Sequence, residues 1–235
     1  MYENKIYYTM AFGFEEKDPS DQTKLICSTD LYKPTLFNTT TIRGIKVWFG
    51  SPPEKKEIKS LLGLEVNYLN FLTGEKKGTK YQGAKIEGAD VIIKELELKE
   101  GEYFTKFNLI FSDYITYVIF GTNKREIELG DKNSGNQLNS LQELNAGKYV
   151  ILNLKGKCGK NGIRCLGCDY MLFKDFLLLR AQDLFKIRNK LKNDKEYKAK
   201  YENPEVVNKL NPEFKLYLKI CKAPNIIFKS VISYL

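Results

Sequence analysis

The chain has 235 residues, of which 43% are hydrophobic and 29% charged, and it contains no histidine. This composition is typical of a globular protein, and the lack of histidine excludes Ser-His-Asp and Cys-His catalysis and histidine-based metal sites. The net charge is +9, with much of the excess in residues 174–235, which carry fourteen basic and seven acidic side chains. A basic segment of this kind favours an acidic partner surface.

Residues 1–35 are predicted to form an N-terminal extension with one or two strands. Apolar residues run from Ile6 to Phe14, a turn-rich segment follows, and a second short apolar run covers Leu25–Cys27. The start of the chain lacks the basic and long apolar regions of a signal peptide, and no apolar run approaches the about 20 residues of a membrane-spanning helix. We therefore expect a cytoplasmic address, with the cytoskeleton as one option, and no membrane span.

Residues 36–173 are strand-like almost throughout. Glu95–Lys99 alternates apolar and polar residues, and the apolar runs Tyr103–Phe111 and Tyr114–Phe120 are separated by a turn signal at Ser112 and Asp113. Lys148–Leu154 is a further strand run before a glycine-rich turn. Seven or more short strands with turns between them predict an all-β barrel, sandwich or prism.

The hydrophobic period changes from two to that of a helix at about residue 173. Two Asn-Pro-Glu sequences, at 203–205 and 211–213, signal helix starts, because Asn is a favoured N-cap and Pro a favoured first residue. Residues 174–235 are therefore predicted to form a basic amphipathic tail of one long helix and two shorter ones. The apolar residues of the long helix are Phe173, Phe176, Leu177, Leu184, Ile187 and Leu191.

The polar side of this tail is rich in basic residues. Such a face can dock to a protein, be merely solvated, or bind nucleic acid or a membrane. Because no nucleic-acid motif is visible, we favour docking to an acidic protein surface or a larger multi-subunit assembly. The candidate docking residues are Lys186, Arg188, Lys190, Lys192, Lys195 and Lys198.

Four segments of the strand-rich region, in order and at suitable spacing, resemble the jacalin-related lectin family. They are Ile42–Gly50, Leu98–Phe104, Ile115–Gly130 and Tyr149–Tyr170. The resemblance covers about residues 41–172. It implies an all-β core, a threefold β-prism over residues 36–173, to which the chain adds its C-terminal α-helical extension.

The resemblance also implies a sugar site at one end of the prism, between a glycine-rich N-terminal loop and the closing hairpin. Aligning Leu166-Gly167 with the family's Ile-Gly places Arg164 where the family has a sugar-binding Asp. A carboxylate accepts hydrogen bonds from sugar hydroxyls, whereas Arg can only donate. The Gly-Gly loop is also missing, so the usual site is expected to be degenerate. The candidate residues at this position are Lys160, Asn161, Gly162, Ile163, Arg164 and Asp169.

Cys158, Cys165 and Cys168 lie within eleven residues, and Cys-x-x-Cys is a zinc-binding spacing. No second such pair exists, and on a strand Cys165 and Cys168 would point to opposite faces. We therefore expect no metal and no cofactor, and reduced thiols.

Together these patterns predict a non-enzymatic binding module that acts as a docking or structural subunit of a larger assembly. The alternative is a functional lectin for mannose- or galactose-type glycans. The sequence leaves open whether the helical tail packs on the prism or on a partner.

Overall fold

The computed structural model describes most of the chain. The described residues are 7–13, 24–25, 40–52, 56–71, 73–78, 81–84, 86, 90–111, 113–133, 148–159, 161–210 and 212–233.

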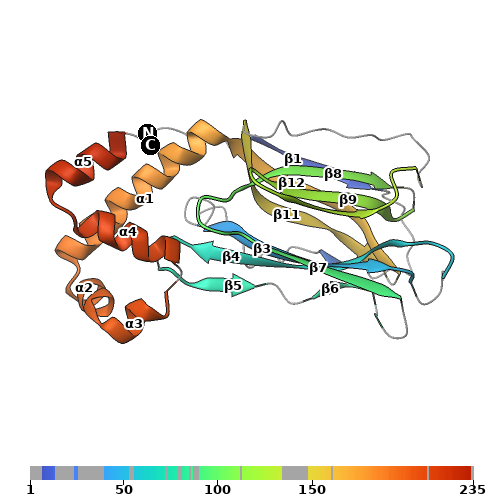
Figure 1. Ribbon diagram of the computed structural model, residues 1–235, viewed down its shortest axis with the longest axis horizontal. Helices are drawn as coiled ribbons and strands as arrows, with labels where there is room; N and C mark the ends of the chain where they lie inside the picture. Colours follow the sequence, from blue (N-terminus) through green and yellow to red (C-terminus); the bar gives the residue numbers. More distant parts are fainter. Residues whose placement is uncertain are drawn as a thin grey trace.

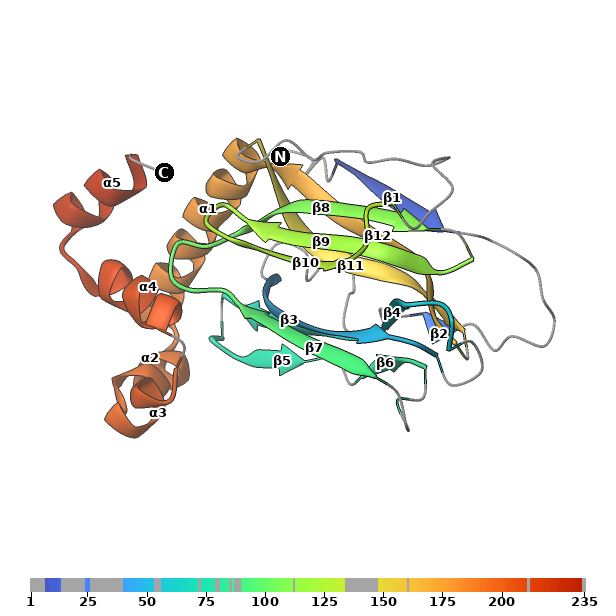
Figure 2. The same ribbon diagram turned by 45° about the vertical axis from the view of Figure 1, so that its right-hand side comes forward.

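The described strands form three antiparallel sheets, which lie beside one another in Figures 1 and 2. The first contains, in order, β1 (Tyr7–Gly13), β12 (Gly162–Leu172), β11 (Tyr149–Gly159) and β2 (Lys24–Leu25). The second contains β5 (Lys76–Gly78), β4 (Ser60–Asn70), β3 (Thr40–Gly50) and β7 (Val91–Glu97), with β6 (Gln82–Gly83) also paired to β4. The third contains β10 (Glu126–Gly130), β9 (Ile115–Thr122) and β8 (Phe104–Phe111).

The three sheets share one hydrophobic core, which confirms the predicted β-prism. On β3, Ile45, Val47 and Phe49 are buried at a spacing of two residues, because successive side chains of a strand point to opposite faces. Val118 of β9 and Leu166 of β12 join the same core from the other two sheets. Each fully buried aliphatic side chain contributes about 1.5–3 kcal/mol.

The N-terminal segment contributes strands to the prism itself. β1 pairs antiparallel with β12, with Ala11 opposite Gly167, and β2 pairs with β11, with Leu25 opposite Lys157. The sequence places residues 1–35 in an extension outside the prism, whereas these two strands form the edges of the first sheet. The rest of that segment lies outside the described residues.

The segments that carry the family resemblance hold a turn in place. The Glu102 carboxylate accepts hydrogen bonds from Arg125 Nε and Nη2, each at 3.0 Å, and from the backbone N–H of Lys99 at 2.7 Å. Arg43 Nη2 donates to the carbonyls of Leu98 at 3.1 Å and Lys99 at 3.2 Å. These side chains therefore fix the connection between β7 and β8.

The described residues from 173 onward form helices. Asp194 separates the first two and caps the second, since its Oδ1 accepts from the backbone N–H of Tyr197 at 2.9 Å. Asn203 caps the third in the same way, with Glu205 N at 2.9 Å, as its Asn-Pro-Glu sequence predicts. No helix in the described part of the chain is long and apolar enough to cross a membrane. The helices are α1 (Phe173–Asn193), α2 (Lys195–Glu202), α3 (Pro204–Asn208), α4 (Pro212–Lys222) and α5 (Asn225–Ser233).

The helical tail packs on one end of the prism, which answers the question that the sequence leaves open (Figure 1). Phe176 of α1 packs with Val150 and other apolar residues of the first sheet. Tyr201 of α2 donates its Oη to the carbonyl of Thr73 at 2.7 Å, beyond the end of β4. Tyr217 of α4 stacks on Phe71, with ring centroids 5.4 Å apart. The apolar face of the tail is therefore occupied by the prism and by the other helices.

Candidate functional site

The closing hairpin between β11 and β12 lies at the end of the prism away from the tail. Asn161 is buried, and its Nδ2 donates to Tyr114 Oη at 3.4 Å. Gly162 has a φ of 142°, and a Cβ at this position would lie 2.9 Å from the carbonyl oxygen of Leu61. The hairpin thus packs closely against the start of β4 and the turn before β9.

Arg164 occupies the position at which the family resemblance implies an Asp. It lies near the start of β12 and is half-buried. Its guanidinium carbon is 5.8 Å from the centroid of the Tyr114 ring, a cation–π contact. The hairpin therefore presents a hydrogen-bond donor at this position.

Asp169 lies far along β12 from this turn. Five residues of strand at roughly 3.4 Å each separate it from Arg164 by about 17 Å. It is buried, accepts from Asn153 Nδ2 at 3.1 Å, and forms an ion pair with Lys155 at 2.6 Å. Asn153 Oδ1 in turn accepts from Tyr68 Oη at 2.7 Å. The only acid near the hairpin in sequence thus belongs to a buried network in the body of the prism.

The structure brings together only part of the predicted sugar site. Asn161, Gly162 and Arg164 lie around Tyr114, whereas Ile163 belongs to the hydrophobic core. Lys160 lies outside the described residues.

A groove of about 560 Å³ opens at the same end of the prism. The groove lies beside the hairpin, because Lys59 lines it and directly precedes β4, against whose start the hairpin packs. Glu57 and Asp131 supply carboxylates, and Ile58 and Ile92 supply apolar surface. Sequence reasoning missed this groove, because its residues come from separate loops and strand ends and share no motif. The lining residues are Phe49, Glu57, Ile58, Lys59, Ile92, Thr116, Gly130 and Asp131.

Five of the six candidate docking residues of the tail are exposed. Some of them also contact neighbours: Lys186 lies 3.5 Å from Asp183 and Lys198 lies 3.9 Å from Glu202, each on its own helix, and Lys190 of α1 lies over the ring of Tyr197 of α2. The exposed five are Lys186, Lys190, Lys192, Lys195 and Lys198.

Arg188 differs from the other five, because it is only 7% exposed. Its Nη1 donates to the carbonyls of Cys221 at 2.7 Å and Ala223 at 2.8 Å, and its Nη2 donates to Asn225 Oδ1 at 2.7 Å. The guanidinium also lies 4.3 Å from the centroid of the Phe228 ring. Arg188 therefore joins the end of α4 to the start of α5 and is not available to a partner.

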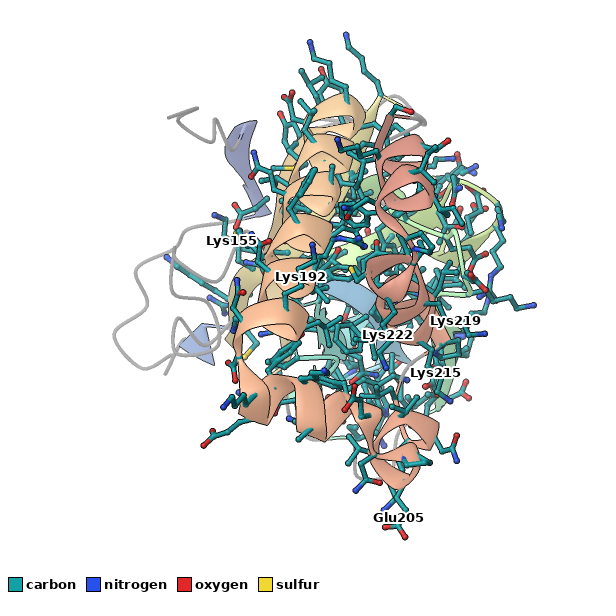
Figure 3. The ribbon with its side chains drawn as sticks, turned by 90° about the vertical axis from the view of Figure 1, so that its left-hand side faces the viewer. Lys155, Lys192, Glu205, Lys215, Lys219 and Lys222 are labelled. Atoms are coloured by element: carbon teal, nitrogen blue, oxygen red, sulfur yellow. The ribbon has the colours of Figure 1, made fainter. Side chains whose placement is uncertain are left out.

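Further lysines gather on the end of the tail that faces away from the prism. Figure 3 shows Lys192 of α1 together with Lys215, Lys219 and Lys222 of α4 on this face. Lys215 donates to the carbonyl of Asn208 and Lys222 to that of Tyr201, each at 2.9 Å. The sequence signal for these residues is the lysine content of α4, which the docking prediction did not use.

The cysteines do not form a metal cluster in the described part of the chain, where no three potential metal-binding side chains gather. Cys158 and Cys168 are buried in the prism core and Cys165 is half-buried. Burial raises the pKa of the Cys168 thiol to about 12, with the Asp169 charge as a smaller cause. Such a thiol stays protonated at neutral pH and is a poor nucleophile and metal ligand.

Comparison with known proteins gives one family. The model of the jacalin-like lectin domain matches residues 41–168, more than half of the chain. No curated protein matches. Among solved structures, the chain is similar to Malaysian banana lectin, at 15% identity and a TM-score of 0.46 over 70% of this chain and 98% of that one. It is also similar to a mannose-binding jacalin-related lectin from Ananas comosus, at 14% identity and a TM-score of 0.46 over 71% and 98%. Artocarpin in complex with mannotriose gives 20% identity and a TM-score of 0.47 over 70% and 97%.

Proposed function

Because this chain belongs to the jacalin-like lectin family, we propose that it is a non-enzymatic module of that fold whose usual sugar site is degenerate. On this proposal it acts as a docking or structural subunit of a larger assembly in the cytoplasm, with the cytoskeleton as one location. The observation that carries the proposal is Arg164, a donor-only side chain where sugar binding needs an acceptor.

The geometry of the hairpin supports the degenerate site. The described hairpin residues from 159 to 164 contain no carboxylate. Asp169, which could replace the missing acid, is already paired with Lys155 and Asn153 inside the sheet. Turning it toward the hairpin would leave the Lys155 ammonium without this carboxylate, which is costly for a partly buried charge.

The helical tail supports the docking role. Its apolar face is occupied by the prism and by the other helices, so the lysines of α1 and α2 lie on the outside of the packed unit. A preformed basic surface loses little conformational entropy on binding and complements an acidic protein surface.

The docking role is tested by charge reversal of the full-length chain in native extracts. The variant Lys192→Glu/Lys195→Glu/Lys198→Glu should shift the protein from a large complex to a smaller species in size-exclusion chromatography. The control Lys56→Glu/Lys77→Glu, with two reversals at exposed prism positions, should leave the complex intact. Deletion of the tail is a poor test, because it would expose the prism residues that the tail covers. An unchanged complex in the triple variant would exclude docking through these lysines.

A second candidate function is sugar binding at the groove beside the hairpin. It is favoured by Glu57 and Asp131, whose carboxylates can accept hydroxyl donors, next to the apolar Ile58 and Ile92. Glycan-array binding should be measured for the wild type, Arg164→Asp and Asp131→Asn. Sugar-competable binding by the wild type that Asp131→Asn abolishes would establish this candidate. If the wild type binds no glycan and Arg164→Asp does, the result would support the degenerate site.

A further inference from the structure

The start of α5 presents large apolar side chains to solvent. α5 lies at the end of the molecule away from the prism (Figure 1). Ile226 is 79% exposed and Ile227 is 51% exposed. Burial of such side chains is strongly favourable, so their exposure at the tip of the molecule calls for a partner.

This exposure is imposed by the packing of α5. Phe228 is buried against Phe185 of α1, with ring centroids 5.1 Å apart, and Asn225 is held by Arg188. Two residues of an α-helix span about 200°, so Ile226 points away from the side that Phe228 buries. The tail therefore holds Ile226 outward.

α1 adds one residue to this apolar surface. Phe185, which contacts Phe228 of α5, is itself 46% exposed. We call Phe185, Ile226 and Ile227 the apolar tip surface.

The segments around this surface carry positive charge only. Residues 184–193, 214–222 and 225–233 contain no Asp or Glu. They pack together, since Cys221 Sγ donates to the carbonyl of Leu184 at 3.3 Å and Phe228 contacts Phe185. Several of their lysines are visible on the end face in Figure 3. The exposed lysines are Lys186, Lys190, Lys192, Lys219, Lys222 and Lys229.

We infer that this end of the tail binds the surface of an anionic lipid bilayer, with the first turn of α5 inserted among the headgroups. Lysines near the surface are attracted to anionic headgroups, and large apolar side chains on an exposed helix enter the boundary between headgroups and acyl chains. An acidic protein surface alone would account for the lysines but would leave Ile226 and Ile227 in water. This inference goes beyond the docking role and does not depend on it.

The test is co-sedimentation of the full-length protein with vesicles of phosphatidylcholine alone and of phosphatidylcholine and phosphatidylserine in equal parts. The wild type should bind the mixed vesicles and not the neutral ones, and added salt should weaken binding. Ile226→Ser/Ile227→Ser should lower the partition coefficient by about tenfold or more, and Lys222→Gln/Lys229→Gln should weaken binding to the mixed vesicles. The control is Ile93→Ser on β7, which changes a prism isoleucine of 53% exposure and should leave binding unchanged.

Circular dichroism establishes that each variant keeps its helices. The inference is overturned if the wild type does not bind the mixed vesicles, or if Ile226→Ser/Ile227→Ser binds as well as the wild type. Loss of a protein partner by that variant, with no vesicle binding by the wild type, would assign the apolar tip surface to a protein interface instead. None of these outcomes decides whether Lys192, Lys195 and Lys198 dock a protein, so the two proposals fail separately.

Discussion

The prism and the tail each contain a buried carboxylate beside an arginine, and the two pairs differ in how they are solvated. In the prism, Glu102 is 1% exposed but accepts hydrogen bonds from Arg125 and from the backbone N–H of Lys99. The hydrogen bonds from Arg125, followed by that from Lys99, hold the pKa of Glu102 below its usual range despite its burial. Arg125 itself keeps 40% of its side chain exposed to water.

The pair in the tail is enclosed on both sides. Arg180 is 3% exposed and Asp183 is 0% exposed, with Nη1 and Oδ2 3.2 Å apart. The guanidinium lies 3.9 Å from the centroid of the Phe71 ring of the prism. Burial raises the pKa of Asp183 above its usual range, although Arg180 and Lys186 act in the opposite direction. The family motif thus supplies donors that stabilise its carboxylate, whereas the junction between tail and prism encloses charges at a cost.

The largest expected effect comes from breaking the enclosed pair. Arg180→Met should destabilise the protein by about 3 kcal/mol at neutral pH, because Asp183 is then enclosed without the arginine. Arg180→Met/Asp183→Leu should recover most of this loss, because no buried charge is left. Urea unfolding of both variants measures the difference. Equal stability of the single and double variants would show that the junction tolerates Asp183 without Arg180.

A smaller effect is expected at the contact between Gly74 and the tail. Gly74 has a φ of 69°, and a Cβ there would lie 2.6 Å from Phe214 Cδ1 on α4. Gly74→Ala should therefore cost about 2–3 kcal/mol in unfolding free energy, from backbone strain and the clash together. Gly101→Ala is the matched control, because Gly101 has the same φ but a Cβ there would meet only Lys124 Nζ at 3.8 Å. If the two variants lose equal stability, the tail contributes nothing at this contact.

The hydrogen-bonded pair of the prism should be worth less. Glu102→Gln should lower the unfolding free energy by about 2 kcal/mol at neutral pH, through the loss of charge-assisted hydrogen bonds. Because the folded pKa of Glu102 is lowered, its contribution is present above the unfolded value of about 4.3 and is lost as the pH falls through the folded pKa. The difference between wild type and variant should thus shrink in acid. A difference that stays constant with pH would assign the loss to packing.

The smallest expected effect is a change in how the unfolding free energy depends on pH, and it comes from Asp183. Its folded pKa is raised, so its contribution to stability is complete below the unfolded value of about 3.9 and is lost as the pH rises through the folded pKa. Asp183→Asn should remove this fall in stability. The loss of stability at acid pH that Glu102 causes should remain. Thermal unfolding of wild type and variant across this range measures both. The same slope in the two proteins would show that Asp183 does not titrate in the enclosed site.

Local sequence patterns were sufficient to predict secondary structure and helix caps, because these depend on residues close together in the chain. The alternation along Glu95–Lys99, in which Leu96 and Leu98 are buried and the residues beside them are exposed, and the Asn203 cap were predicted correctly from sequence. Arg188 looked like its neighbouring lysines, but its side chain meets carbonyls more than thirty residues later. No local pattern could separate a buried arginine from exposed lysines on the same helix.

The sequence by itself determined the strand-rich core, the helical tail and the donor-only residue at the hairpin, because periodicity and residue type are local properties. Only the tertiary structure decided that the tail packs on the prism, that Arg180 and Asp183 are enclosed, and that Ile226 and Ile227 stay outside. The physical reason is that burial is set by contacts between segments far apart in the chain. Those contacts also position Glu57 and Asp131 in one groove, which no spacing in the sequence encodes.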